Sequence, residues 1–125
     1  MEEFDIAIIG GGPAGIMAAI AASADLNVVL LEKNSSLGSK LLITGGGRCN
    51  ITNEKPIKKL LNSFHDKNFL KHSFYTFTNE MLLDLFRNRG LDFIVEDNNR
   101  VFPETEKSQD ILAILKSVSY THLRA

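Results

Sequence analysis

The sequence has little cysteine, no large excess of either charge and no long uninterrupted apolar run. Its one cysteine cannot form an internal disulfide, which is typical of a reducing compartment. With 14 basic and 15 acidic residues the formal net charge is -1, and no basic stripe is evident, so electrostatic binding of nucleic acid is not expected. Residues 6–22 are apolar, but glycines 10–12 interrupt them and the run is short for a bilayer. We expect a cytoplasmic protein without a membrane span, because residues 1–5 are acidic where a secretory signal would be basic.

What the sequence does contain is a glycine turn between an apolar run and an Ala-rich stretch. Residues 6–9 predict a strand buried on both faces of a parallel sheet. Pro13 falls at a first helical position, where its missing N–H costs nothing, and the helix is expected to reach about residue 23. The turn between them has the pattern G-x-G-x-x-G, formed by Gly10, Gly12 and Gly15.

A second apolar run, residues 27–31, completes a βαβ unit. Two parallel strands joined by a helix predict a right-handed crossover. Glu32 follows the second run at the spacing typical of an acidic residue that binds a ribose. With 125 residues, 44% of them hydrophobic and 23% charged, the chain is long enough for one small α/β domain with a modest core.

The glycine turn suits a ligand that contains a pyrophosphate. Backbone N–H groups at a helix N-terminus bind such an anion, helped by the helix dipole. Gly10 permits the tight turn, Gly12 lets the backbone reach the phosphates, and Gly15 lets helix and strand pack closely. Glu32 would accept hydrogen bonds from the ribose hydroxyls and repel a 2′-phosphate, which disfavours NADP at this site. The alternative is a glycine-rich turn that binds nothing, which would not need the spaced acid.

The rest of the chain predicts a loop followed by short elements. Residues 33–53 are rich in Gly, Ser, Asn and Thr, and a loop of that length usually has a function. Residues 56–75 predict one or two short helices. Two short strands are expected around a turn at residues 97–99, over the ranges 91–96 and 100–102.

Two further helices are predicted from apolar spacing. Residues 79–89 form the clearer one, with Gly90 as its C-terminal stop, and its shared apolar face is expected to comprise Met81, Leu82, Leu85 and Phe86. Ser108 is expected to cap the last helix, whose inward residues would be Ile111, Leu112 and Leu115.

A second glycine motif lies at residues 40–53 and reads Lys-Leu-Leu-Ile-Thr-Gly-Gly-Gly-Arg-Cys-Asn-Ile-Thr-Asn. Together with residues 10–15, the pair Glu32-Lys33 and the later Arg100-Val101-Phe102-Pro103, it resembles the bacterial NAD(P)/FAD-dependent oxidoreductases, some of them aminoacetone-oxidase-like flavoproteins. The resemblance covers roughly residues 4–116. It implies a partial Rossmann-like FAD-binding domain in which the βαβ unit holds FAD and the second glycine loop wraps it.

The resemblance also implies which residues bind the cofactor. They are Gly10, Gly12, Pro13, Ala14, Gly15, Glu32, Lys33, Lys40, Thr44, Gly45, Gly46, Arg48, Cys49 and Asn50. Arg48 could pair with a phosphate or fix the loop, and a second interpretation is that Arg48 and Asn50 only brace it. Cys49 has no partner cysteine, so we expect it to pack rather than to react.

No metal site is expected, because the three histidines lack metal-like spacing. Lys55, Lys58 and Lys59 are expected to form a solvated helix face rather than a docking patch.

The activity implied by the resemblance is hydride transfer between NAD(P)H, FAD and an unidentified small organic substrate, with catalytic residues that the sequence does not reveal. Two alternatives remain open. An RNA-modifying flavoprotein also begins with a glycine-rich βαβ unit, but it would need a basic surface. A non-catalytic NAD-binding module explains the first glycine turn and Glu32, but leaves residues 44–50 unexplained.

The resembling proteins are several times longer than this chain. We therefore expect residues 1–116 to be the N-terminal part of a truncated FAD-binding domain, and residues 117–125 to be a non-native tail. Alone, the chain is expected to bind FAD weakly or not at all and to show no turnover. Unpaired strand edges and open apolar faces would favour aggregation instead.

Overall fold

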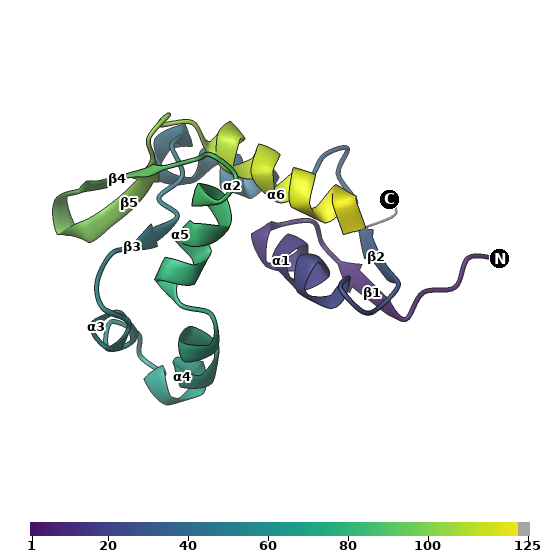
Figure 1. The fold of residues 1–125 in the computed structure, drawn as a ribbon, viewed down its shortest axis with the longest axis horizontal. Helices are drawn as coiled ribbons and strands as arrows, with labels where there is room; N and C mark the ends of the chain where they lie inside the picture. Colours follow the sequence, from purple (N-terminus) through teal and green to yellow (C-terminus); the bar gives the residue numbers. More distant parts are fainter. Residues whose placement is uncertain (123–125) are drawn as a thin grey trace.

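The computed structural model describes residues 1–122 and confirms a mixed α/β fold that begins with a βαβ unit (Figure 1). Strands β1 (Ile6–Ile9) and β2 (Val28–Leu31) are parallel, with Ile6 opposite Val28 and Ile9 opposite Leu31. Helix α1 (Pro13–Ala22) connects them, and Pro13 stands at its first turn as predicted.

The β1–β2 sheet is open on one face, so the prediction of a strand buried on both faces is wrong for the described residues. Residues of β1 alternate between partly covered and exposed, and β2 runs from the buried Val28 to the exposed Leu31. Ile9 and Leu31 are 79% and 51% exposed. The continuous apolar run indicates burial on both faces. In the described chain, however, the sheet has two strands and α1 packs against one face of it.

Residues 33–53 are more regular than the predicted loop. They contain helix α2 (Ser39–Ile43), a 3₁₀ turn (Thr44–Gly47) and the short strand β3 (Thr52–Asn53). Gly38 precedes α2 with φ 70°, and a Cβ there would also press into Leu112. Elements this short carry no apolar periodicity, which is why the sequence indicates only a loop.

Two short helices follow, as predicted, and form a hairpin that extends away from the βαβ unit (Figure 1). They are α3 (Ile57–Leu61) and α4 (Lys67–Thr76). Asp66 caps α4, because its side chain accepts a hydrogen bond from the Phe69 N–H at 3.2 Å. Phe64 and Phe74 pack edge to face inside the hairpin, with ring centroids 5.1 Å apart.

Helix α5 (Asn79–Arg87) ends two residues earlier than predicted, before Gly90 at φ 86°. Three residues of the predicted face, Leu82, Leu85 and Phe86, pack on the core as expected. The prediction is wrong for Met81, which is 47% exposed, and Leu83 is buried instead. Thr78 caps the helix, because its side-chain oxygen accepts a hydrogen bond from the Met81 N–H at 3.2 Å.

A small antiparallel sheet with the strand order β3-β5-β4 lies at the other end of the molecule. Strands β4 (Phe93–Glu96) and β5 (Arg100–Pro103) form the predicted hairpin. Its turn places Asn98 and Asn99 at positive φ, which asparagine tolerates well. The pairing of β3 with β5 ties the second glycine motif to this hairpin.

Helix α6 (Ser108–His122) runs from the small sheet back to the βαβ unit and packs on α1 and α2 (Figure 1). Ile111, Leu112 and Leu115 face the core as predicted. The hydroxyl of Ser108 donates to the Leu42 carbonyl at 2.8 Å, so this side chain anchors α6 to α2. The predicted non-native tail begins inside α6, and residues 123–125 lie outside the described residues.

Among the described residues, the helices are all too short or too polar to cross a bilayer. The same part of the chain contains no group of three or more His, Cys, Asp or Glu side chains that could hold a metal ion.

Candidate functional site

Two hollows meet beside Pro13 and Lys40, which line both. The first has a volume of about 390 Å³ and lies at the carboxyl ends of β1 and β2. It is lined by Ile9, Gly10, Gly12, Pro13, Leu31, Glu32, Lys33, Asn34, Gly38, Ser39 and Lys40. In open parallel sheets, ligands bind in the crevice outside the carboxyl ends of the strands.

The glycine turn presents a bare backbone to this first hollow. Gly10 has φ 102°, which only glycine adopts readily, and its N–H donates to the Leu31 carbonyl at 2.8 Å. A Cβ on Gly12 would have no atom within 4 Å, so that position opens into space. A Cβ on Gly15 would overlap the Gly10 carbonyl oxygen. Gly15 therefore has the packing role that the sequence predicts, and Gly12 stands at an open position, while its contact with a phosphate stays a prediction.

Helix α1 begins at this turn without a side-chain cap from the described residues. An α-helix leaves its first N–H groups without partners in the helix, and the helix dipole makes that end positive. The site therefore offers backbone donors and partial positive charge to an anion in the first hollow.

The side chain of Glu32 is held in place by two backbone N–H groups. Its carboxylate accepts from the Gly11 N–H at 2.7 Å and from the Asn34 N–H at 2.8 Å. These two hydrogen bonds, that to Asn34 first, hold the pKa of the carboxyl below its usual value. Glu32 is therefore charged at neutral pH, lines the first hollow and also locks the glycine turn onto β2.

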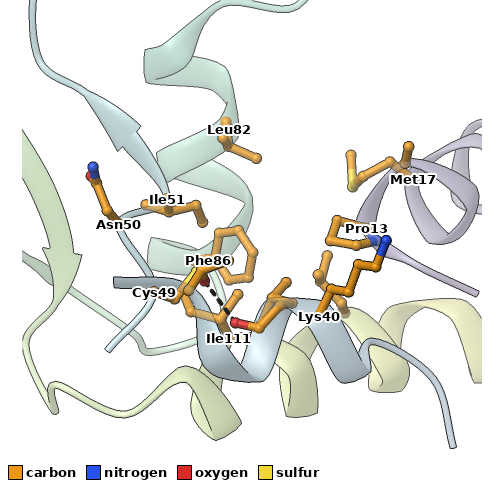
Figure 2. Close-up of a pocket in the computed structure, with 13 residues that line it drawn as sticks. Pro13, Met17, Lys40, Cys49, Asn50, Ile51, Leu82, Phe86 and Ile111 are labelled. Atoms are coloured by element: carbon orange, nitrogen blue, oxygen red, sulfur yellow. Dashed lines mark hydrogen bonds between the residues drawn. The ribbon is translucent and has the colours of Figure 1, made fainter. Parts of the chain in front are cut away.

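The second hollow, of about 420 Å³, is mainly apolar and lies between α1, α2, α5 and α6 (Figure 2). Met17 and Pro13 form one wall, and Ile51, Leu82 and Phe86 lie across the hollow from them. Its lining comprises Pro13, Ala14, Met17, Lys40, Leu41, Thr44, Cys49, Asn50, Ile51, Leu82, Phe86, Ile111 and Leu115.

The loop at residues 44–50 is held in an unusual backbone conformation beside this second hollow. Gly45, Gly46 and Gly47 all have positive φ, and so does Cys49 at 62°. A non-glycine residue seldom adopts that region, so surrounding contacts must hold it there. One of them is the hydrogen bond from the Cys49 N–H to the Thr44 carbonyl, at 3.0 Å.

Cys49 is 4% exposed, and burial raises the pKa of its thiol. A neutral, enclosed thiol is a poor nucleophile. Its position in the core cluster supports the packing role expected from the sequence.

Arg48 points away from both hollows and pairs with the small sheet. Its guanidinium lies 2.6 Å from Glu96 and 3.2 Å from Glu106, and 4.0 Å above the ring of Phe102. The hydrogen bond to Glu96 raises the pKa of Arg48. These contacts favour bracing of the loop over pairing with a phosphate.

The structure brings together most of the residues that the resemblance implies. Gly10, Gly12, Glu32 and Lys33 line the first hollow, Ala14, Thr44, Cys49 and Asn50 line the second, and Pro13 and Lys40 line both. Gly15, Gly45, Gly46 and Arg48 line neither.

Sequence reasoning missed the apolar walls of the second hollow, namely Met17, Leu82, Phe86, Ile111 and Leu115. Their only sequence signal is helical apolar spacing, which predicts a core equally well.

Comparison with known proteins also indicates a Rossmann-type domain. The family described as HI0933-like protein Rossmann domain matches residues 4–122. The 3-dehydro-bile acid delta(4,6)-reductase of Clostridium scindens is 35% identical over 114 residues, which cover 89% of this chain and 27% of that protein. The ribosomal RNA dihydrouridine synthase of Escherichia coli is 34% identical over 118 residues, which cover 92% of this chain and 28% of that protein.

Among solved structures, Thermovibrio ammonificans THI4 superposes with a TM-score of 0.58 at 16% identity, covering 96% of this chain and 36% of that one. This likeness concerns the fold alone. The chain spans somewhat more than a quarter of the length of the two curated relatives. The family match over residues 4–122 confirms the predicted resemblance, and the chain belongs to the HI0933-like Rossmann-domain family.

Proposed function

We propose that the chain is the FAD-binding part of a flavin-dependent oxidoreductase. The observation that carries this proposal is the pair of neighbouring hollows that share Pro13 and Lys40, one bordered by the charged Glu32 and the N-terminus of α1, the other mainly apolar. FAD has matching halves, an adenosine diphosphate and a flat ring system. The open space beside Gly12 would admit a diphosphate. A Cβ at this position would meet no protein atom and would project into the space that the diphosphate would fill.

Each hollow would hold one half of the cofactor. The free amides at the start of α1 would bind the diphosphate, and the carboxylate of Glu32 would accept from the ribose hydroxyls. Lys40 lies where the hollows meet and would add positive charge there. The apolar walls between Met17 and Leu82 would exclude water from the ring system.

When bound, FAD would take a hydride from NAD(P)H and give it to an oxidised substrate. The names of the two curated relatives suggest the substrate class. A 3-dehydro-bile acid with delta(4,6) bonds and the uracil ring of uridine share a C=C bond conjugated to a carbonyl. We propose a cytoplasmic enzyme that reduces such a bond, with the net uptake of one hydride from NAD(P)H and one proton from water.

A non-catalytic NAD-binding module is the competing proposal. It would use the first hollow and leave the second without a function. The second hollow and the braced loop beside it support FAD instead, because that loop encloses space beyond the reach of the glycine turn.

The test is the visible absorption of the whole purified protein, followed by anaerobic mixing with NADH and with NADPH. We expect a flavin spectrum that bleaches with one of the two donors and returns when an enone is added. The corresponding saturated ketone is the matched control and should leave the flavin reduced. A colourless protein that binds NAD would contradict the proposal and support the module.

A further inference from the structure

A third hollow, of about 330 Å³, lies between β3 and the helices α3, α4 and α5. It is lined by Thr52, Leu60, Ser73, Phe74, Phe77, Thr78, Asn79 and Leu82. Leu82 also lines the second hollow, and Thr52 directly follows Ile51, which lines the second hollow as well. Leu82 and Ile51 both lie across the second hollow from Met17 (Figure 2). The third hollow therefore adjoins the second at this wall.

Two side chains that line the third hollow are held in place by other parts of the chain. The ring of Phe74 packs edge to face on Phe64, with centroids 5.1 Å apart. Asn79 is 9% exposed, and its amide donates to the carbonyls of Asn53 and Lys55 at 2.7 and 2.9 Å. These contacts exist without a ligand, so the hollow is formed in advance, as is usual for small-molecule sites.

The polar groups of the third hollow suit an uncharged ligand. Both amide hydrogens of Asn79 are donated to backbone carbonyls, so its oxygen is the atom that can accept from a ligand. The Thr78 oxygen accepts from the Met81 N–H at 3.2 Å, which leaves its hydroxyl hydrogen as a donor. In the described chain, the lining of this hollow contains no charged side chain. A phosphate or carboxylate placed here would lose water without gaining a counter-charge.

We propose that the third hollow binds the part of the substrate that carries no reacting atom, and that this part is an uncharged ring. The inference rests on the proposed function, because the reacting bond would lie against the flavin in the second hollow. The rest of the molecule would then pass Leu82 into the third hollow. Phe74 and Phe77 favour a ring there, since rings pack well on aromatic side chains. Asn79 and Thr78 would orient it.

The experiment titrates the whole FAD-loaded protein, oxidised and without NAD(P)H, with cyclohexenone and with phenylcyclohexenone in a calorimeter. The phenyl ring should lower the Kd by about tenfold or more, because the third hollow buries it. Ser73→Leu fills that hollow and should remove this advantage, while the Kd of cyclohexenone stays unchanged. Thr76→Leu places the same side chain on α4 outside the hollow. It is the matched control and should bind both enones as the parent does.

A second variant, Phe77→Ala, removes an aromatic wall that is 40% exposed and should weaken binding of the phenyl compound severalfold. Equal Kd values for phenylcyclohexenone in the parent and both variants would overturn the inference. So would a phenyl ring that brings no gain in affinity, the result expected if another segment of the whole protein fills the hollow.

The flavin separates this inference from the proposed function. A flavin-containing protein that reduces cyclohexenone but gains no affinity from the phenyl ring rejects the third hollow alone. A colourless protein that binds phenylcyclohexenone, and loses this binding in Ser73→Leu, rejects the proposed function alone.

Discussion

At the scale of single residues, Gly12 and Gly15 separate cofactor binding from folding. Gly12 has φ -77°, a value that any residue adopts, and a Cβ there would meet no protein atom. Gly15 lies where a Cβ would overlap the Gly10 carbonyl. The same change at two positions of one motif should therefore have opposite effects.

We predict that Gly12→Ala lowers the FAD affinity of the whole protein by about tenfold or more, because the methyl group displaces hydrogen bonds to a charged diphosphate. Its free energy of unfolding without FAD should be unchanged. Gly15→Ala should lower that free energy by about 1–3 kcal/mol through overpacking. Isothermal titration with FAD and urea unfolding of the apoprotein measure the two effects. A Gly12→Ala variant with parental affinity would show that no ligand approaches the turn.

Glu32 gives a prediction in pH. Its pKa is lowered in the folded state by the Asn34 and Gly11 N–H groups. A lowered pKa means that the stabilisation is present above the ordinary carboxyl pKa and is lost as the pH falls through the folded value. The difference in unfolding free energy between the parent and Glu32→Gln should be constant from about pH 8 to about pH 5 and should shrink in acid. Urea titrations across that range test this, and a difference that grows in acid would contradict it.

At the scale of elements, the side chain of Asn79 links β3 to α5, two elements that are separated in the sequence by α3 and α4. Its amide donates to the carbonyls of Asn53 and Lys55, at 2.7 and 2.9 Å, and so ties the end of β3 to the start of α5. The residue is 9% exposed. Removing the amide leaves two carbonyls without this donor.

We predict that Asn79→Ala lowers the free energy of unfolding by about 1–3 kcal/mol. Asn62→Ala, an exposed change at the end of α3, is the control and should stay within about 0.5 kcal/mol of the parent. Hydrogen exchange should accelerate around residues 53–56 in the first variant only. Equal exchange in both variants would show that other contacts hold β3 in place.

The elements also show where sequence reasoning succeeds and where it stops. The positive φ of Gly10, the position of Pro13 at a helix start and the position of Glu32 after a strand can each be predicted from neighbouring residues. The bracing of Arg48 depends on Glu96 and Glu106, which are 48 and 58 residues away along the chain. No local pattern encodes that contact. The apolar lining of the second hollow is equally hidden, because Phe86 and Ile111 have the spacing of ordinary core residues.

At the scale of the whole molecule, we expect the open face of the β1–β2 sheet to determine whether the chain self-associates. The exposed Ile9 and Leu31 lie on a sheet of two strands, and such a sheet offers free edges as well as an apolar surface. The first hollow therefore lies beside an uncovered sheet face in the described chain.

We predict that the chain expressed alone self-associates and retains little flavin. Light scattering coupled to size exclusion should show species larger than a monomer. Leu31→Thr should shift that distribution towards the monomer, whereas Met81→Thr, a change of similar exposure on α5, should not. A monodisperse monomer with flavin near full occupancy would contradict the prediction.

The buried thiol of Cys49 can report the opening of the loop at residues 44–50 without an added label. Because the thiol is buried and its pKa is raised, a disulfide reagent can attack it only when the loop at residues 44–50 swings open. Reaction with Ellman's reagent should be slow in the native chain and fast in urea. Equal rates in the two conditions would show that the loop is already open in the native chain. The colour change would then time the loop's opening without any introduced probe, since the chain has no other thiol to compete.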